Sequence, residues 1–104
     1  MATIKRVGVI GAGQMGSGIA HVCALAGYDV VINDIDTQKI EDGLRVIDRN
    51  MSRQVSRGIV GELDKREAFA RIKAAPTLAE FGDVDLAIEA ATENEEIKDR
   101  KSVV

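Results

Sequence analysis

The 104-residue sequence predicts an α/β fold, in which helices flank a doubly wound parallel sheet. Three observations support this prediction. Short apolar runs alternate with segments of helical periodicity, as in right-handed βαβ units. The first apolar run ends in a glycine-rich turn, and the second ends in an acidic residue. Such sheets bind ligands at the crevice where the carboxyl ends of their strands meet.

Composition indicates one domain of ordinary globular character. The chain has 14 basic and 17 acidic residues, and its net charge of -3 argues against nucleic acid as the main partner. Its only cysteine, Cys23, cannot form an internal disulfide and suits a reducing compartment. The apolar run after Arg6 is too short for a signal sequence or a membrane span, so we expect a cytoplasmic protein.

The first half of the predicted fold is a βαβ unit. Residues 7–10 form a continuous apolar run, which is typical of a strand buried on both faces. Residues 29–34 read as a second buried strand that ends in acid. Between them, residues 14–26 have helical spacing, and Gly27 suits the left-handed position after a helix. The apolar residues expected to face the core are Met15, Ile19, Val22, Cys23 and Ala26.

A helical hairpin is expected to follow as an insertion in the sheet. Residues 37–57 form a long helical pattern that ends at Gly58. A shorter helix is predicted over residues 63–72, with Phe69 and Ile72 facing inward. The apolar stripe of the longer helix consists of Ile40, Leu44, Ile47, Met51 and Val55.

The last part of the chain predicts an edge strand over residues 74–77, a buried strand over 84–90 and a helix beginning at 93. A doubly wound order places the first and last clear strands side by side. The final helical pattern has no terminator, so we expect an incomplete domain. Its last strand would leave a sheet edge and apolar surface exposed, which favours self-association.

The turn after the first strand matches a dinucleotide-binding fingerprint, Gly-x-Gly-x-x-Gly. Gly11 permits a tight turn, Gly13 lets the backbone approach a diphosphate, and Gly16 lets the helix pack closely on the strand. The free N–H groups and the positive end of the following helix would then face the diphosphate. The predicted phosphate-binding residues are Gly11, Ala12, Gly13, Gln14, Met15 and Gly16.

Asp34 occupies the position of the acidic residue that completes this fingerprint. It lies 18 residues beyond Gly16, close to the expected spacing. A carboxylate there accepts hydrogen bonds from the adenosine ribose and repels a 2′-phosphate, and Asp36 adds negative charge. The cofactor is therefore expected to be NAD rather than NADP, while the fingerprint alone leaves FAD open.

The segments IKRVGVIGAGQMGSGIA, GYDVVINDID and VDLAIEAATENEEIK together resemble the N-terminal NAD-binding domain of the 3-hydroxyacyl-CoA dehydrogenase family. The resemblance is to the bacterial 3-hydroxybutyryl-CoA dehydrogenases in particular, and it runs from about residue 4 to residue 98. The resemblance implies a Rossmann-type NAD-binding domain spanning residues 1–104, truncated before the C-terminal dimerisation and substrate domain. It also implies that Asp34 binds the ribose and that Glu93 and Lys98 lie near the nicotinamide. From the residues alone, Glu93 and Lys98 would lie in a solvent-facing first helical turn.

The long helix also carries a basic stripe. Arg45, Arg49, Arg53 and Arg57 are four residues apart and lie roughly opposite the apolar stripe. Such stripes are usually solvated helix faces. The resemblance implies that this hairpin contacts coenzyme A, whose phosphates suit guanidinium groups. The candidate substrate-binding residues are Asn50, Ser52 and Arg53.

The family oxidises 3-hydroxyacyl-CoA to 3-ketoacyl-CoA with a catalytic histidine in a segment similar to HFFNP, and this chain lacks that segment. Its one histidine, His21, is expected to be a packing or surface residue of the first helix. Cys23 is expected to be a small core residue. One histidine and one cysteine among scattered carboxylates predict no metal site. We therefore assign no catalytic residue to this chain, which is expected to bind NAD without turnover.

Two other functions stay open at this point. The domain could be a freestanding nucleotide-binding or redox-sensing module that acts through a partner, because fold alone does not define function. It could also belong to a dehydrogenase of the 3-hydroxyisobutyrate or 6-phosphogluconate type. Those enzymes prefer an asparagine–arginine pair after the second strand, where this chain has Asn33-Asp34-Ile35, which makes them the weaker alternative.

Overall fold

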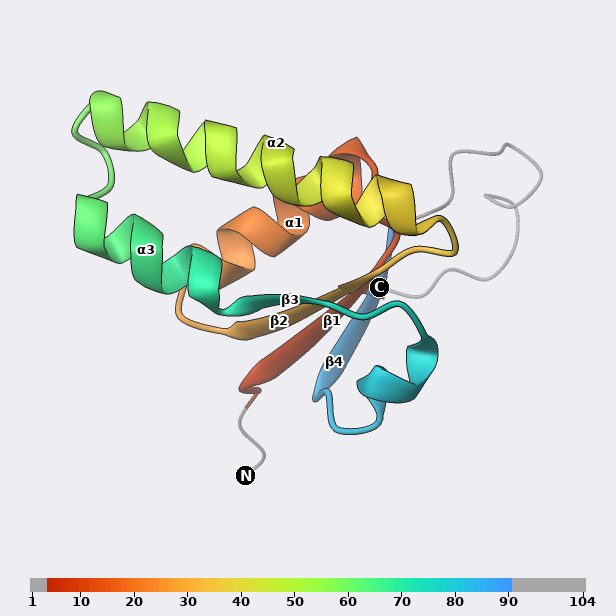
Figure 1. Ribbon diagram of the computed structural model, residues 1–104. Coiled ribbons are helices and arrows are strands. Elements are labelled where there is room, and N and C mark those ends of the chain that lie inside the picture. Colours follow the sequence, from red (N-terminus) through yellow and green to blue (C-terminus); the bar gives the residue numbers. More distant parts are fainter. Residues whose placement is uncertain (1–3, 91–104) are drawn as a thin grey trace.

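The computed structural model describes residues 4–90, which form one parallel sheet and its covering helices (Figure 1). The strands are β1 (Arg6–Ile10), β2 (Asp29–Asn33), β3 (Ile72–Ala74) and β4 (Leu86–Glu89). The helices are α1 (Gln14–Leu25), α2 (Thr37–Ser56), α3 (Glu62–Ala70) and a short 3₁₀ helix, η1 (Leu78–Phe81). The predicted α/β class is confirmed.

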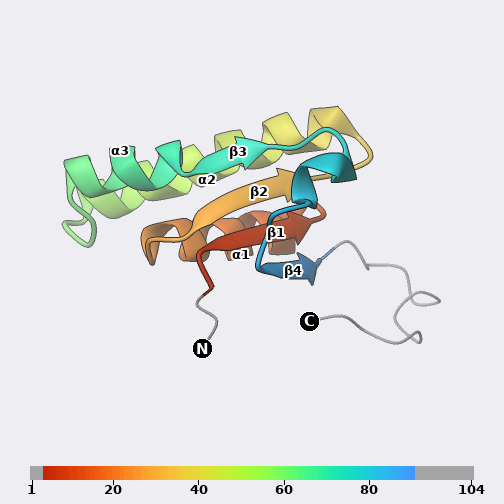
Figure 2. The ribbon, with the colours of Figure 1, turned by 90° about the horizontal axis from the view of Figure 1, so that it is seen from below.

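The sheet has the strand order β3-β2-β1-β4, with every pair parallel (Figure 2). In the register, Gly8 of β1 lies between Val31 of β2 and Ala87 of β4. The prediction that the first and last strands are neighbours is therefore confirmed. This order places the end of β1 at the centre of the sheet's carboxyl edge, where such sheets bind ligands.

The helices α1, α2 and α3 cover one face of the sheet, and η1 lies on the other (Figures 1 and 2). Side chains alternate along a strand, so Val7 and Val9 enter the core under the helices while Gly8 faces η1. A Cβ on Gly8 would lie 2.5 Å from the Phe81 ring, so only glycine leaves room for this aromatic side chain. The largest fully buried side chains are Ile32, Ile47, Met51, Val7, Val9 and Val30.

The predicted inward face of α1 is right for Ile19 and Cys23, which pack against the core, and wrong for Met15, Val22 and Ala26, which are exposed. Met15 and Val22 are 62% and 66% exposed, whereas the helix buries its smaller residues. Small side chains let α1 approach the strands and the glycine loop closely, and this close packing outweighs the burial of two larger apolar groups. Gly27 has a φ of 106°, which confirms its left-handed role after the helix. The buried residues of α1 are Gly16, Ser17, Ala20, His21 and Ala24.

The helical hairpin is confirmed as the antiparallel pair α2 and α3 (Figure 1). The apolar stripe of α2 faces the core as predicted, with Ile40, Ile47 and Met51 buried, and Gly58 follows with a φ of 74°. The end of α3 is different, because the helix stops at Ala70 and Ile72 begins β3. The edge strand therefore covers residues 72–74 and not 74–77, since Ile72 pairs with Val30 whereas Pro76 has no N–H to donate.

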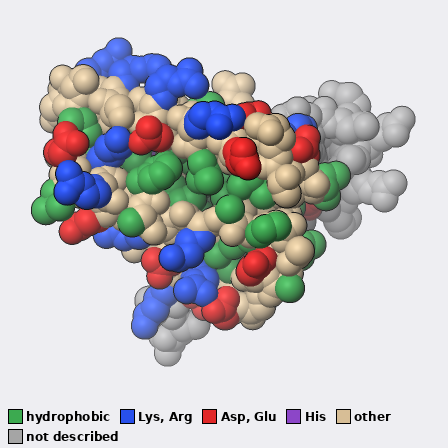
Figure 3. Space-filling view, in the orientation of Figure 1, with side chains coloured by type: hydrophobic (Ala, Val, Ile, Leu, Met, Phe, Trp, Pro, Cys, Tyr) green, Lys and Arg blue, Asp and Glu red, His purple; other side chains and the backbone are tan. Residues whose placement is uncertain are grey.

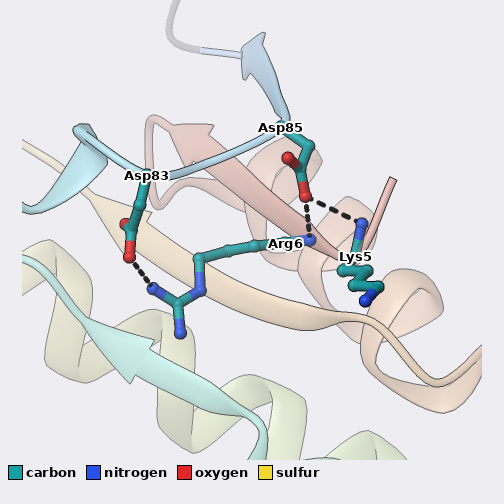
Figure 4. Close-up of polar contacts among 4 residues, drawn as sticks. All are labelled: Lys5, Arg6, Asp83 and Asp85. Carbon is teal, nitrogen blue, oxygen red and sulfur yellow. Dashed lines mark hydrogen bonds and ion pairs between the residues drawn. The ribbon is translucent and has the colours of Figure 1, made fainter. Parts of the chain in front are cut away.

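The strand β4 is shorter and less buried than predicted for residues 84–90. Its residues from Leu86 to Glu89 are exposed or half-buried because β4 pairs with β1 alone in the described part of the chain. Before it, Asp85 Oδ2 accepts hydrogen bonds from the N–H groups of Lys5 and Arg6, at 2.9 and 3.0 Å. The Arg6 guanidinium pairs with Asp83 beside it (Figure 4). These contacts connect the start of β4 to the start of β1. The helix predicted from residue 93 lies outside the described residues.

The hydrogen bonds to Asp85 give the sheet an acid-sensitive contact. The N–H groups of Lys5 and Arg6 lower the pKa of this carboxyl below its ordinary value, because they favour the ionised form. A group with a lowered folded pKa stabilises the fold above its unfolded pKa and loses that effect as the pH falls through the folded value. We expect Asp85→Asn to lower Tm near neutral pH and to reduce the further loss of Tm below about pH 4. Thermal melts across this range test it, and parallel pH profiles for both proteins would contradict it.

Candidate dinucleotide-binding site

The turn between β1 and α1 is closed by glycine geometry. Gly11 has a φ of 110°, in the region that residues with a side chain avoid. Its N–H donates to the carbonyl of Asn33 at 2.7 Å, which ties the turn to the end of β2. A Cβ built on Gly16 would lie only 1.7 Å from the carbonyl oxygen of Gly11. The first and last glycines of the motif are therefore in direct contact.

The amino end of α1 presents unpaired donors at this turn. Gly13 is the N-cap residue, in an extended conformation and with no side-chain cap, and the first turn contains no acidic residue. The first intrahelical bond runs from the Ser17 N–H to the Gly13 carbonyl at 2.9 Å. The N–H groups of Gly13, Gln14, Met15 and Gly16 thus have no intrahelical acceptor, and the helix dipole favours an anion there.

Asp34 lies directly after β2 and reaches back to the glycine loop. Its Oδ2 accepts from the Ala12 N–H at 2.9 Å, and its Oδ1 accepts from the Asp36 N–H at 3.0 Å. Burial alone would raise the pKa of this half-buried carboxyl, but the two N–H donors and the nearby Lys39 charge together lower it. The carboxylate is therefore ionised near neutral pH, and each oxygen keeps a lone pair for a further donor.

A cavity of about 410 Å³ opens between the glycine loop and α2. Lys39 and Asp42 stand at one side of it, and Val46 adds apolar surface from the next turn of α2. The cavity combines donors, both charge signs and an apolar wall, which is typical of a site for a small organic ligand. The lining residues are Ala12, Gly13, Gln14, Ser17, Lys39, Asp42, Gly43 and Val46.

The candidate substrate residues lie on two sides of α2. Asn50 and Arg53 are four and seven residues beyond Val46, so they continue the side of the helix that lines the cavity. Ser52 instead accepts a hydrogen bond from Lys65 Nζ of α3 at 3.0 Å. The predicted arginine stripe is exposed, and basic side chains gather along the α2 edge of the molecule in Figure 3. Glu93 and Lys98 lie outside the described residues.

His21 and Cys23 both take part in packing the fold. His21 is 9% exposed and its Nε2 lies 2.8 Å from Gln54 Oε1, a hydrogen bond that joins α1 to α2. Cys23 is half-buried against the core, and burial raises the pKa of its thiol, which disfavours the reactive thiolate. Among residues 4–90, no three metal-binding side chains lie together. Within the same range, no helix has both the length and the apolarity needed to cross a membrane.

Five residues that line the cavity are absent from the sequence prediction: Ser17, Lys39, Asp42, Gly43 and Val46. Lys39 contributes charge close to Asp34, and Ser17 and Gly43 line the cavity beside Ala12. Lys39 lies in the first turn of α2, and its position five residues beyond Asp34 is a signal that the sequence contains. Ser17 and Gly43 lie far apart in the sequence, and only the packing of α2 against α1 brings them together.

A glycine loop at the end of the central strand, an uncapped helix start and a carboxylate at the next strand define a dinucleotide-binding domain of the Rossmann type. The family model described as 3-hydroxyacyl-CoA dehydrogenase, NAD binding domain, matches residues 6–102. The chain belongs to this family, and its cofactor is NAD. The match does not favour a freestanding redox-sensing module.

Individual relatives agree with this assignment. A 3-hydroxybutyryl-CoA dehydrogenase of Bradyrhizobium diazoefficiens is 55% identical over 97 residues, covering 93% of this chain and 33% of the relative. A probable 3-hydroxybutyryl-CoA dehydrogenase of Bacillus subtilis is 38% identical, covering 88% and 32%. The crystal structure of (S)-3-hydroxybutyryl-CoA dehydrogenase from Ralstonia eutropha has a TM-score of 0.86 and 38% identity, covering 92% and 34%. The chain thus spans about a third of the length of these relatives.

Proposed function

We propose that this chain is the NAD-binding part of a 3-hydroxybutyryl-CoA dehydrogenase, which oxidises 3-hydroxyacyl-CoA to 3-ketoacyl-CoA. The observation that carries the proposal is the glycine loop, whose free N–H groups face the same edge of the sheet as Asp34. The similarity to the Bradyrhizobium and Ralstonia enzymes supports the substrate class. The domain occupies residues 1–104, the dimerisation and substrate domain lies beyond them, and the complete enzyme is cytoplasmic.

In this proposal, the residues of the loop and Asp34 divide the binding of NAD between them. The N–H groups at the start of α1 bind the diphosphate, and Asp34 accepts from the adenosine ribose. Glu93 and Lys98 act near the nicotinamide. NAD, when bound, supplies the hydride acceptor. The full set of proposed NAD-binding residues is Gly11, Ala12, Gly13, Gln14, Met15, Gly16, Asp34, Glu93 and Lys98.

The proposed substrate contacts lie on α2. Asn50, Ser52 and Arg53 bind coenzyme A, with the Arg53 guanidinium paired to a phosphate. Arg53 is exposed and is on the cavity side of the helix, which supports its role more directly than that of Ser52. Removal of the hydroxyl proton needs a general base, and the only histidine of this chain is held by Gln54. The base therefore comes from outside these 104 residues, and the chain alone binds without turnover.

The proposal is tested by titrating NADH and following its fluorescence. We expect the chain to bind NADH, and to bind NADPH at least tenfold more weakly. The added phosphate of NADPH would face Asp34 and Asp36, and like charges in contact cost roughly several kcal/mol. Absence of binding at millimolar NADH would overturn the proposal.

Acetoacetyl-CoA is added to the same sample to test two claims: that the chain binds an acyl-CoA, and that it lacks the general base needed for turnover. We expect it to bind without loss of nicotinamide absorbance, and we expect Arg53→Glu to weaken this binding while leaving NADH binding unchanged. Arg66→Glu, on α3, is the control for the change of charge. Turnover by the chain alone would contradict the assignment of the base to another segment.

The edge of the sheet supports a further part of the proposal, self-association with a second copy. In the described residues, β4 has one strand neighbour, and Leu86 is 37% exposed. An unpaired edge with apolar side chains favours pairing with another chain. Sedimentation equilibrium tests this, and a monodisperse monomer at high concentration would contradict it.

A further inference from the structure

The peptide unit between Ala12 and Gly13 is held from inside the protein by a serine. Ser17 is 3% exposed, and its Oγ donates a hydrogen bond to the Ala12 carbonyl at 3.0 Å. The preceding peptide is held as well, because the Ala12 N–H donates to Asp34. The peptide groups before and after Ala12 are therefore both held by side chains, those of Asp34 and Ser17.

The orientation of this peptide decides where the next donor points. A peptide bond is planar and trans, so the Ala12 carbonyl and the Gly13 N–H point in opposite directions. Because Ser17 draws the carbonyl toward the buried side of α1, the Gly13 N–H is directed away from it, at a residue that is half-exposed. This N–H is the first of the unpaired donors at the start of α1.

Gly43 of α2 covers the same hydrogen bond from the other side. A Cβ built on Gly43 would lie 2.7 Å from Ser17 Oγ and 2.9 Å from the Ala12 carbonyl oxygen. Both distances are shorter than a carbon atom tolerates, so a side chain here would displace the serine hydroxyl or the carbonyl. The absence of a side chain at 43 thus lets α2 close over the hydrogen bond without disturbing it.

We propose that Ser17 and Gly43 are positioning residues for the NAD diphosphate: the serine hydroxyl orients the Ala12–Gly13 peptide, and the glycine leaves room for that hydroxyl. Neither residue acts on the cofactor directly; both act through the Gly13 N–H. The inference rests on the proposed function, in which the glycine loop binds the diphosphate. It adds a residue pair that connects the cofactor loop to the helix carrying the proposed coenzyme A contacts.

The test compares ligands that do and do not contain a diphosphate. Ser17→Ala is expected to weaken binding of NADH and ADP about tenfold, the effect of one well-placed hydrogen bond, and to leave competition by adenosine unchanged. Ser56→Ala, at the exposed end of α2, makes the same chemical change away from the loop and is expected to have no effect. All affinities are measured well below the Tm of each variant, so that a loss of stability does not enter them.

A double-mutant cycle then tests whether the two positions act on one peptide. Gly43→Ala alone is expected to weaken NADH binding about tenfold, and the double variant is expected to lose less than the product of the two single effects. In spectra of the ligand-free protein, the Gly13 amide resonance should move in each single variant. Effects that multiply would overturn the shared action.

The outcomes separate this inference from the proposed function. If the unaltered chain binds neither NADH nor ADP, the proposed function fails, and the inference fails with it. If the chain binds both ligands and Ser17→Ala binds them equally well, only the inference fails. An equal loss for NADH and adenosine would also overturn it, because a purely structural defect does not distinguish the diphosphate.

Discussion

A Gly16→Ala variant is expected to lose NADH binding and to unfold at a much lower temperature. The added Cβ would lie 1.7 Å from the Gly11 carbonyl oxygen, a backbone atom of the same loop. Alanine favours a helix over glycine by about 1 kcal/mol, but forcing a methyl group into a packed site costs about 3 kcal/mol or more here. The overlap therefore outweighs the gain in helix propensity, and relief requires α1 to move away from the strand end where the diphosphate is proposed to bind.

Gly18→Ala provides a matched control on the same helix. A Cβ at Gly18 meets no atom within 4 Å, and the residue is exposed. Only the propensity effect remains there, so this variant should be stabilised by about 1 kcal/mol and should bind NADH normally. Thermal melts and NADH titrations of the two variants test the prediction. Equal affinities for the two alanine variants would contradict the close contact between the first and last glycines.

An Asp34→Ala variant is expected to bind NADH at least tenfold more weakly. The substitution removes the proposed ribose acceptor, and it also leaves the N–H groups of Ala12 and Asp36 without their present partner. Losing one charge-assisted hydrogen bond costs about 1.5–3 kcal/mol, which is more than tenfold in affinity. The discrimination against NADPH should also become smaller, because the substitution removes a negative charge from the proposed ribose site. Paired titrations with NADH and NADPH measure both effects.

Asp34→Asn separates the two roles of this side chain. The amide keeps one oxygen acceptor, so it can still hold one of the two backbone donors. It lacks the charge, so discrimination against NADPH should fall while stability is better preserved than in Asp34→Ala. Asp29→Ala, at the opposite end of β2, is the control for losing an exposed carboxylate from the same strand. An unchanged NADH affinity in Asp34→Ala would exclude Asp34 from the ribose site.

The sequence predicts those parts of the fold that depend on local pattern. The strands β1 and β2 are continuous apolar runs, and α2 has a clear apolar stripe, so their positions agree with the structure within a residue. The glycine turn and Asp34 are also local features, because their spacing follows from the length of one helix and one strand. Their roles in NAD binding stay predictions that the titrations described above test.

The predictions that are wrong concern packing between elements, which the local sequence pattern does not determine. Hydrophobic periodicity predicts that Met15 and Val22 face inward, but α1 lies so close to the strands that its small residues fill the interface. Ile72 fits the apolar periodicity of α3, yet its pairing with Val30 places it in a strand. The contact of Ser17 with Gly43 has no counterpart in spacing or composition, since the two residues are 26 positions apart with a strand between them.

The hydrogen bonds between Asp85 and the start of β1 have a consequence for the order of folding. Its two hydrogen bonds join residues 80 and 79 positions apart, whereas β1 and β2 are neighbours across a single helix. Contacts between distant residues form more slowly than local ones, because a longer loop must close first. During synthesis, β1 therefore gains its β2 neighbour early and keeps its other edge unpaired until β4 has left the ribosome. For that interval, the strand that carries the glycine loop has an edge open to pairing with the wrong partner.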